Sequence, residues 1–378
     1  MRGPLSLLLL LAGVAACQPS PEPSVSAGTS AAPAPAPAPA PAQPTSPSAA
    51  GTALAAVTAD NFVRAETDLY FGKVIQDAGQ VGKYHHNRDV TPIDHQTVVR
   101  QNRDTLYSGA VFDLDAGPVT ITLPDVGSRF MSMQLIDEDQ YTHKVIYAPG
   151  AHTLTRKDIG TRYVMAPVRI LVDPTKPGDL EQVRALQDAI KVEQPGGPGT
   201  FEAPRWDQVS QKKVRDALLS LASTLPDTRK AFGMKADVDP VRRLIGAASA
   251  WGGNPDKDAL YLNVVPEKND GTTIHRLTVK DVPVDGFWSI SLYNADGFFQ
   301  QNSENAYSIN NVTAKQAGDG SVTVQFGGCD GKVPNCLPIM KGWNYMVRLY
   351  RPREAALDGT WTFPEAQPSS SVAPCDST

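Results

Sequence analysis

The chain has 378 residues, too many for one ordinary hydrophobic core, and this length predicts two domains with accessory segments. Its 35 basic and 40 acidic side chains give a formal net charge of -5, which argues against nucleic acid or an anionic membrane surface as an electrostatic partner. Many of its 32 prolines precede residue 50, so the low-complexity part lies at the amino end and the remainder reads as globular.

Residues 1–16 have the pattern of an export signal. Arg2 supplies the positive end, and the apolar run that follows is too short to span a bilayer. The tetrapeptide 14–17 (VAAC) resembles the bacterial lipobox, which implies cleavage before Cys17 and lipid attachment to it. Gln18 in place of Asp fits sorting to the outer membrane, facing the periplasm. The expected membrane partner is therefore a lipid anchor in the cell envelope, and the alternative is an ordinary secretory signal cut nearby.

Residues 17–56 are rich in Ser, Pro and Ala and alternate Ala with Pro from 32 to 42. They lack the apolar bulk that would offset the loss of chain entropy on folding. Alternating proline favours polyproline II, so this segment is expected to be a disordered, semi-rigid tether. A second flexible tail is expected over residues 366–378.

A first β domain is predicted over residues 57–177. Apolar residues at helical spacing predict a helix from about 59 to 78, closed by Gly79. The runs 118–124 and 129–137 flank the turn residues Asp-Val-Gly-Ser and predict a hairpin. Further strands are predicted at 143–147 and 162–172.

Residues 178–252 are predicted to form a helical connector, and residues 253–365 a second β domain. Three apolar stripes predict the connector helices, at 179–192, 206–225 and 238–251. Short β-branched and aromatic runs predict the later strands, at 259–265, 273–279, 287–293, 321–326 and 345–350. The predicted fold class is mainly β, with two antiparallel β-sandwich or jelly-roll-like domains, an amino-terminal helix and a helical connector.

Short sequence motifs in both predicted β domains resemble those of two known families. Residues 100–108 (RQNRDTLYS) and 123–130 (LPDVGSRF) resemble the bacterial domain-of-unknown-function family numbered 1254. Residues 285–297 (DGFWSISLYNADG) and 348–352 (RLYRP) are similar to the companion family numbered 1214. The resemblance implies two β-sandwich, jelly-roll-like domains joined by helices, and it implies no settled activity.

The cysteines are assigned by their surroundings. Cys329 and Cys336 bracket a short polar loop and are predicted to form a structural disulfide in an oxidising compartment. Cys375 is left unpaired in the tail. A cysteine-based metal site would need more ligands at short spacing than the chain offers.

The segment 100–107 is the leading candidate site. Asp104 and Tyr107 are predicted as acid/base groups, and Arg100, Asn102 and Arg103 as ligand-binding residues, because cations, a carboxylate, an amide and a phenol gather there. The alternative is structural: Arg100, Arg103 and Asp104 could form a buried ion-pair and hydrogen-bond corner that fixes the strand entry.

His143 is the third predicted catalytic residue. It follows the acidic cluster 137–139, whose paired carboxylates could raise one pKa and provide an acid or base. The alternative is a solvated turn. In the second domain Trp288, Tyr293 and Asn294 are predicted to bind a ligand, since aromatic and amide groups near strand ends suit amphiphilic ligands; the alternative for them is core packing.

Other kinds of chemistry find little support. No Gly-x-Ser-x-Gly pentapeptide is present, so Ser108 is interpreted as a strand residue. His85, His86 and His95 with Asp94 could converge on a metal, but adjacent imidazoles usually point apart. No metal and no cofactor are therefore predicted.

Three functions remain open at this point. The first is a lipid-anchored protein outside the cytoplasm that binds a small or polymeric ligand between its two β domains. The second is a cofactor-independent hydrolase of ester-like or polyether-like compounds that uses Asp104, Tyr107 and His143. The third is a structural envelope protein.

Overall fold

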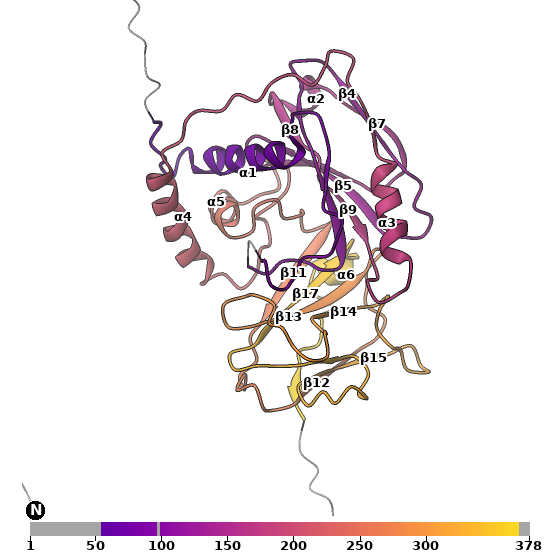
Figure 1. Ribbon diagram of the computed structural model, residues 1–378. Coiled ribbons are helices and arrows are strands. Elements are labelled where there is room, and N and C mark those ends of the chain that lie inside the picture. The colour runs from indigo at the N-terminus through magenta and orange to yellow at the C-terminus, as the bar shows by residue number, and fades with distance from the viewer. Residues whose placement is uncertain (1–53, 97–98, 370–378) are drawn as a thin grey trace, which may run out of the picture. The chain divides into compact units, whose positions relative to one another are not determined.

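The computed structural model describes residues 54–96 and 99–369, so Cys17, residues 17–53 of the expected tether and Cys375 lie outside the described residues. The described chain contains two β blocks, coloured indigo to magenta and orange to yellow in Figure 1. Helices α1, α4 and α5 lie beside one another next to the first block (Figure 1). None of the described helices is long and apolar enough to cross a membrane.

Helix α1 (Phe62–Ala78) begins the described fold and agrees with the predicted helix. It ends at Gly79, whose left-handed backbone (φ 80°) lets its N–H bond the carbonyl of Gln76. Phe62 and Phe71 are fully buried on the inner face of the helix. This burial anchors α1 to the helices on one side and to the first block on the other.

The first block contains two antiparallel sheets. The larger has seven strands in the order β1-β2-β9-β5-β8-β3, with β6 paired to β5. Its strands are β1 (His85–His86), β2 (Thr105–Gly109), β3 (Val111–Asp113), β5 (Met131–Asp137), β6 (Thr142–Ile146), β8 (Tyr163–Met165) and β9 (Val168–Leu171). The smaller consists of β10 (Lys191–Glu193), β4 (Val119–Leu123) and β7 (Gly150–Leu154). A short helix, α2 (Arg156–Ile159), follows β7.

The predicted hairpin between residues 118–124 and 129–137 was wrong. Strand β4 pairs with β7 and β10, whereas β5 pairs with β6, β8 and β9 in the other sheet. The burial of the two strands explains the separation. Every residue of β5 is buried, as in a strand covered on both faces, but β4 alternates and is covered on one face only. The turn residues between them carry the chain from one sheet to the other.

The predicted connector is divided between two packing layers. Helix α3 (Asp179–Asp188) packs against the first-block core through Val183 and Leu186, and β10 directly after it joins β4. Helices α4 (Gln208–Ala222) and α5 (Pro240–Ser249) pack against α1 instead. Residues 189–192, predicted as helix, therefore lie partly in a sheet, because pairing with β4 completes that edge.

The second block contains two four-stranded sheets. One has the order β11-β17-β13-β14, and the other β16-β15-β12-β18. Their bounds are β11 (Ala259–Val264), β12 (His275–Val279), β13 (Trp288–Tyr293), β14 (Ser308–Asn310), β15 (Val322–Phe326), β16 (Cys336–Leu337), β17 (Asn344–Tyr350) and β18 (Gln367–Pro368), with helix α6 (Glu354–Leu357) before β18. Pairing is antiparallel except between β15 and β16.

The two blocks have separate hydrophobic cores, which confirms the mainly β, sheet-on-sheet fold class. The second core is centred on fully buried aromatic rings, with Trp343 stacked on Phe326 at 5.1 Å between centroids. The predicted disulfide is also confirmed. Cys329 and Cys336 are bonded and close the loop that leads into β16.

A buried carboxylate on α1 makes stability depend on pH. Asp68 accepts a hydrogen bond from Trp206 Nε1 at 2.8 Å, but its burial raises the pKa to about 6. The folded state therefore binds more protons than the unfolded state between about pH 4 and 6. The free energy of unfolding falls by about 3 kcal/mol from this group as the pH rises through that window.

We expect Asp68→Asn to remove this fall, since the amide oxygen still accepts from Trp206. Urea unfolding at pH 4 and pH 7 measures it: the variant should gain about 3 kcal/mol on wild type between the two pH values. The control is Asp77→Asn, the same change at an exposed position of α1. An equal pH response in wild type and Asp68→Asn would contradict the prediction.

Candidate ligand-binding cleft

The predicted segment 100–107 lies where the first block meets β17 of the second. Asn102 Nδ2 donates to the hydroxyl oxygens of Tyr107 at 3.2 Å and Tyr350 at 3.0 Å. The Oδ1 atom of Asn102 accepts from the backbone N–H of Asp104 at 2.8 Å. With Arg348 these residues form the interblock cluster (Asn102, Asp104, Tyr107, Arg348 and Tyr350), which joins strands from both blocks.

Arg348 holds this cluster together from the second block. Its guanidinium donates to the Ser291 hydroxyl at 2.8 Å, to the Arg100 carbonyl at 2.8 Å and to the Tyr293 hydroxyl at 2.9 Å. Tyr293 in turn donates to the Gln101 carbonyl at 2.7 Å. The backbone of the predicted site is therefore bound by side chains of β13 and β17.

The two arginines of the segment 100–107 contact the second block. Arg100 donates to Asn344 Oδ1 at 2.6 Å. Arg103 bonds the Thr91 carbonyl and lies over the ring of Tyr307, 5.2 Å from its centroid. Neither makes an ion pair with a carboxylate of the described residues. Of the predicted structural alternative, the hydrogen bonds are therefore present, and cation–π contacts stand in place of the ion pairs.

The pKa values of the two acid/base groups of the cluster shift in opposite directions. Burial raises the pKa of Asp104 although the positive charge of Arg348 opposes it, and Asp104 Oδ1 accepts from Asn310 Nδ2 at 3.2 Å. Burial is the largest influence on Tyr107 and opposes its ionisation. The Arg169 guanidinium, 5.4 Å from the centre of its ring, lowers the pKa of this phenol together with the hydrogen bonds to Asn102 and Thr105 and the charge of Arg348. The cluster thus makes the Asp104 carboxyl a weaker acid and the Tyr107 phenol a stronger acid than the free side chains.

The remaining predicted site residues lie elsewhere. His143 Nε2 is 2.8 Å from Asp137 Oδ2, and Arg64 pairs with the neighbouring Glu138 and Asp139 at 2.7 Å each. Trp288 is buried and packs edge-on against Phe363 in the second core. Asn294 Oδ1 accepts from two backbone N–H groups of its own turn. Among the described residues, His143 has no hydrogen bond or ion pair with Asp104 or Tyr107.

The histidines predicted as a weak metal candidate also separate. His86 Nδ1 is 2.8 Å from the Ser108 hydroxyl in the β1–β2 pair. Within residues 54–96 and 99–369, no three His, Cys, Asp or Glu side chains gather as a metal ligand set.

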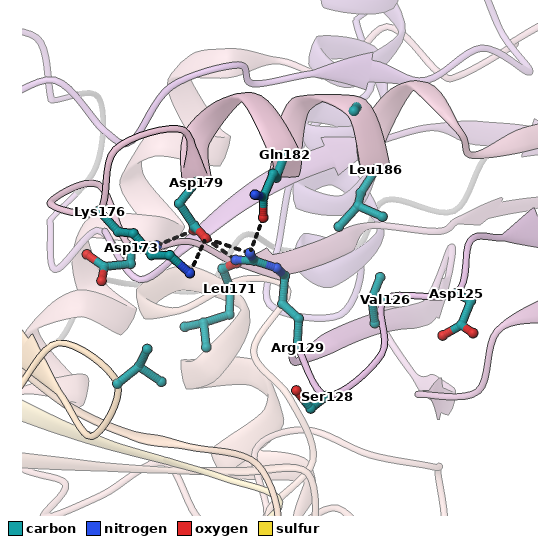
Figure 2. A pocket seen from close by; sticks show the side chains of 12 residues that line it. Asp125, Val126, Ser128, Arg129, Leu171, Asp173, Lys176, Asp179, Gln182 and Leu186 are labelled. Atoms are coloured by element: carbon teal, nitrogen blue, oxygen red, sulfur yellow. Dashed lines mark hydrogen bonds and ion pairs between the residues drawn. The ribbon is translucent and has the colours of Figure 1, made fainter.

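A cavity of about 650 Å³ opens as a cleft at the boundary of the two blocks. Its walls come from the turn after β4 (residues 125–129), from residues 171–176 after β9, from α3, and from Val312 of the second block. Figure 2 shows these side chains, with Arg129 in the middle of the cleft and Asp125 and Asp173 on opposite sides of it. We call this cavity the cleft.

A buried ion pair forms the floor of the cleft. Arg129 makes a two-point contact with Asp179, with Nη2 to Oδ1 at 2.6 Å and Nη1 to Oδ2 at 2.8 Å (Figure 2). Asp179 Oδ2 also accepts from the Asp173 N–H at 2.9 Å. The hydrogen bond from Arg129 is the largest cause of a lowered Asp179 pKa, although burial opposes it. The pair is rigid and preorganised.

The polar groups around the floor remain open to solvent. Lys176 is largely exposed, with Nζ 4.0 Å from Asp179 Oδ1. Asp125 and Asp173 use Oδ1 for hydrogen bonds within their own turns, to Gly127 and Thr175. Within the described part of the chain, Oδ2 of these two aspartates accepts no hydrogen bond. Apolar walls such as Leu186 complete the mixed lining that small-molecule sites have.

The cleft and the interblock cluster are linked through Asp104 and Asn310. The Asp104 carbonyl accepts from the Val172 N–H at 2.9 Å, next to Leu171 in the cleft wall. Asn310 donates to Asp104 and accepts from the N–H of Val312, which is the cleft-lining residue from the second block. The predicted segment thus lies behind the cleft and positions both of its sides.

Sequence reasoning did not identify the cleft residues. They come from four separated segments, and the Asp-Val-Gly-Ser turn was used only as a hairpin signal and as part of the motif that resembles family 1254. The available signal was charge pattern: Asp173, Lys176 and Asp179 lie close together at the start of an amphipathic helix, where an acidic residue favours the helix amino end.

Comparison with solved structures supports the fold. The VPA0106 protein from Vibrio parahaemolyticus aligns with a TM-score of 0.65 and 17% identity, over 82% of this chain and 96% of that one. An uncharacterized protein from Burkholderia cenocepacia aligns with a TM-score of 0.48 and 13% identity, over 78% of this chain and 85% of its own. The first likeness shows the fold alone.

Comparison by sequence identifies the two β regions. No curated protein sequence matches the chain. The family model DUF1254, a protein of unknown function, matches residues 81–158, and DUF1214, also of unknown function, matches residues 263–354. The chain is therefore one that carries a DUF1254 region followed by a DUF1214 region, as the resemblance of its motifs predicted.

Proposed function

We propose that this chain is a binding protein of the cell envelope, outside the cytoplasm, that holds a small polar ligand in the cleft. The observation that carries the proposal is the cleft itself: about 650 Å³, with walls from both blocks around the Arg129–Asp179 pair. Its volume lies within the range of small-molecule sites. Because Asp104 and Asn310 hold the two walls in place, the site is largely formed before a ligand arrives.

The chemistry of the lining favours ligands that donate hydrogen bonds. Asp125 and Asp173 present carboxylate oxygens from opposite sides, and Ser128 adds a hydroxyl. The guanidinium of Arg129 is already bound to Asp179 and Gln182, which leaves Lys176 as the exposed cation of the lining. Polyols and amines fit this set better than dicarboxylates, since an added anion would face three aspartates.

The location rests on the amino end and on the disulfide. Cys17 follows a signal-like segment and would carry the lipid anchor, and the Cys329–Cys336 bond fits an oxidising compartment such as the periplasm. Labelling of growing cells with radioactive palmitate should mark the wild-type protein and leave Cys17→Ser unmarked. Unlabelled wild-type protein would contradict the anchor without affecting the cleft.

The cleft is tested by thermal unfolding with three probes: mannitol, 1,4-diaminobutane and succinate. We expect a polyol or the diamine to raise Tm by several degrees at saturating concentration, and succinate to have no effect. Ala185→Trp places an indole on a cleft-lining position of α3 and should abolish the shift.

The matched control is Ala189→Trp, one turn further along the chain at an exposed position outside the cleft. It should retain the wild-type shift. Equal shifts in the two tryptophan variants would show that the probes bind elsewhere, and the absence of any shift with mannitol and diaminobutane would remove the support for this ligand class.

A further inference from the structure

A second cavity of about 290 Å³ lies in the second block at β11, the edge strand of its sheet. Three segments form its walls: the inner face of β11 and β17, the stretch from Ala356 to Glu365, and residues 226–229. It shares no lining residue with the cleft. We call it the edge cavity.

The inner wall of the edge cavity is apolar. Leu262 faces Val347 and Leu260 faces Leu349 across the β11–β17 pair, so their side chains lie on one face of the sheet. Val347 and Leu349 are fully buried, but Leu262 and Val264 remain only partly covered. Apolar surface therefore lines a space that the protein's own side chains leave open.

Aromatic rings close the opposite side. Trp361 and Phe363 lie 5.9 Å apart, edge to face, and both belong to the lining. Phe363 also contacts Trp288 in the second core, which fixes its position. The wall is thus part of the packed sandwich and does not depend on a loose loop.

Three charged groups lie at the rim. Arg229 donates to the carbonyls of Leu357 at 2.7 Å and Ala356 at 3.2 Å. Asp227 Oδ1 accepts from Arg242 Nη1 at 2.8 Å, and Glu365 is exposed. An anionic ligand group would face Asp227 and Glu365 and would have to compete for Arg229, whereas a neutral polar group would not.

We infer that the edge cavity binds one neutral amphiphile, an aliphatic chain of roughly ten carbons with a hydroxyl or amide head at the rim. The chain fills the space beside Leu262 and Val264, and the head reaches the exposed side chain of Thr362. The volume is at the lower end for small-molecule sites and matches a ligand of about this size. This inference does not depend on the function proposed for the cleft.

The test is calorimetric titration of the full chain with n-decanol. We expect saturable binding at one site, and at least tenfold weaker binding of decanoate, because its carboxylate would face Asp227 and Glu365 at the rim. Decanol that does not bind, or that binds no better than decanoate, would overturn the inference.

Two variants fill the cavity in different ways. Val264→Trp and Leu262→Phe both add volume to the lining and should weaken decanol binding at least tenfold. Val265→Trp is the matched control, because Val265 is the next residue, 64% exposed and outside the lining. Leu262→Phe serves if Val264→Trp does not fold, and folding is checked by Tm.

Two further outcomes decide which cavity binds decanol. Wild-type affinity in a folded filling variant would overturn the edge cavity as the site. Ala185→Trp in the cleft should leave decanol binding unchanged. Loss of decanol binding in this variant would assign decanol to the cleft and overturn the inference. The Tm shifts with mannitol and diaminobutane test the cleft independently of this result.

Discussion

Replacing Arg348 with Met should lower the free energy of unfolding by about 3 kcal/mol or more. The Arg348 side chain is 3% exposed and donates to Ser291, to Tyr293 and to the Arg100 carbonyl. Methionine has similar length but no donor, so these buried acceptors would lose their partner. Each buried group left unsatisfied costs about 1–3 kcal/mol.

Urea unfolding followed by tryptophan fluorescence measures this change. Arg353→Met is the control, because this substitution removes the same charge from a nearby surface position. Arg353 pairs with Asp285 in solvent, and the two side chains are 61% and 49% exposed. Its expected cost is below about 1 kcal/mol. Equal losses in the two variants would show that the interblock cluster adds nothing beyond a surface pair.

Replacing Asp179 with Ala should destabilise the protein by about 3–5 kcal/mol. The substitution leaves Arg129, itself largely buried, without its two-point partner and removes the acceptor of the Asp173 N–H. It also removes an acidic residue from the first turn of α3. The same change should weaken probe binding in the cleft, because Arg129 loses the contact that holds it in place.

The control lies at the other end of the same helix. Asp188 pairs with Arg88 at 2.8 Å but is 63% exposed, so Asp188→Ala should cost less than about 1 kcal/mol. The lowered pKa of Asp179 adds a pH test: its stabilisation is present above the unfolded pKa and is lost as the pH falls through the folded pKa. A difference between wild type and Asp179→Ala that does not shrink in acid would contradict the ion pair.

Strands and helices with a strong period could be predicted from the sequence. The run 345–350 is aromatic and β-branched and became β17, and the helix expected at about 59–78 became α1 with its end at Gly79. These features depend on neighbours along the chain, such as alternation, helical spacing and a glycine stop. Local residues therefore carried enough information.

Pairing partners could not be predicted in the same way. The turn between β4 and β5 has hairpin residues, yet the two strands lie in different sheets. The strand β10 is only three residues long and carries two charged side chains, so it gave no signal by itself. It forms because β4 has an unpaired edge beside it, and no pattern within residues 189–193 records that edge.

The candidate site could likewise be predicted only in part. Asn102, Asp104 and Tyr107 were predicted together and do lie together in the interblock cluster. Their partners Arg348 and Tyr350 are more than 240 residues away in sequence, as the separation of 248 between Asn102 and Tyr350 shows. Only the packing of one block on the other brings these groups within hydrogen-bond distance.

The sequence by itself determined the mainly β class, the disulfide and the polar segment around Asp104. It also gave the expectation of an export signal at the amino end. Tertiary structure alone decided which strands pair, that the Asp104 carboxyl is buried, and that the cleft and the edge cavity exist. The physical reason is range. Propensity and loop closure act over a few residues, whereas cavities and pKa shifts depend on every segment that displaces water from the same place.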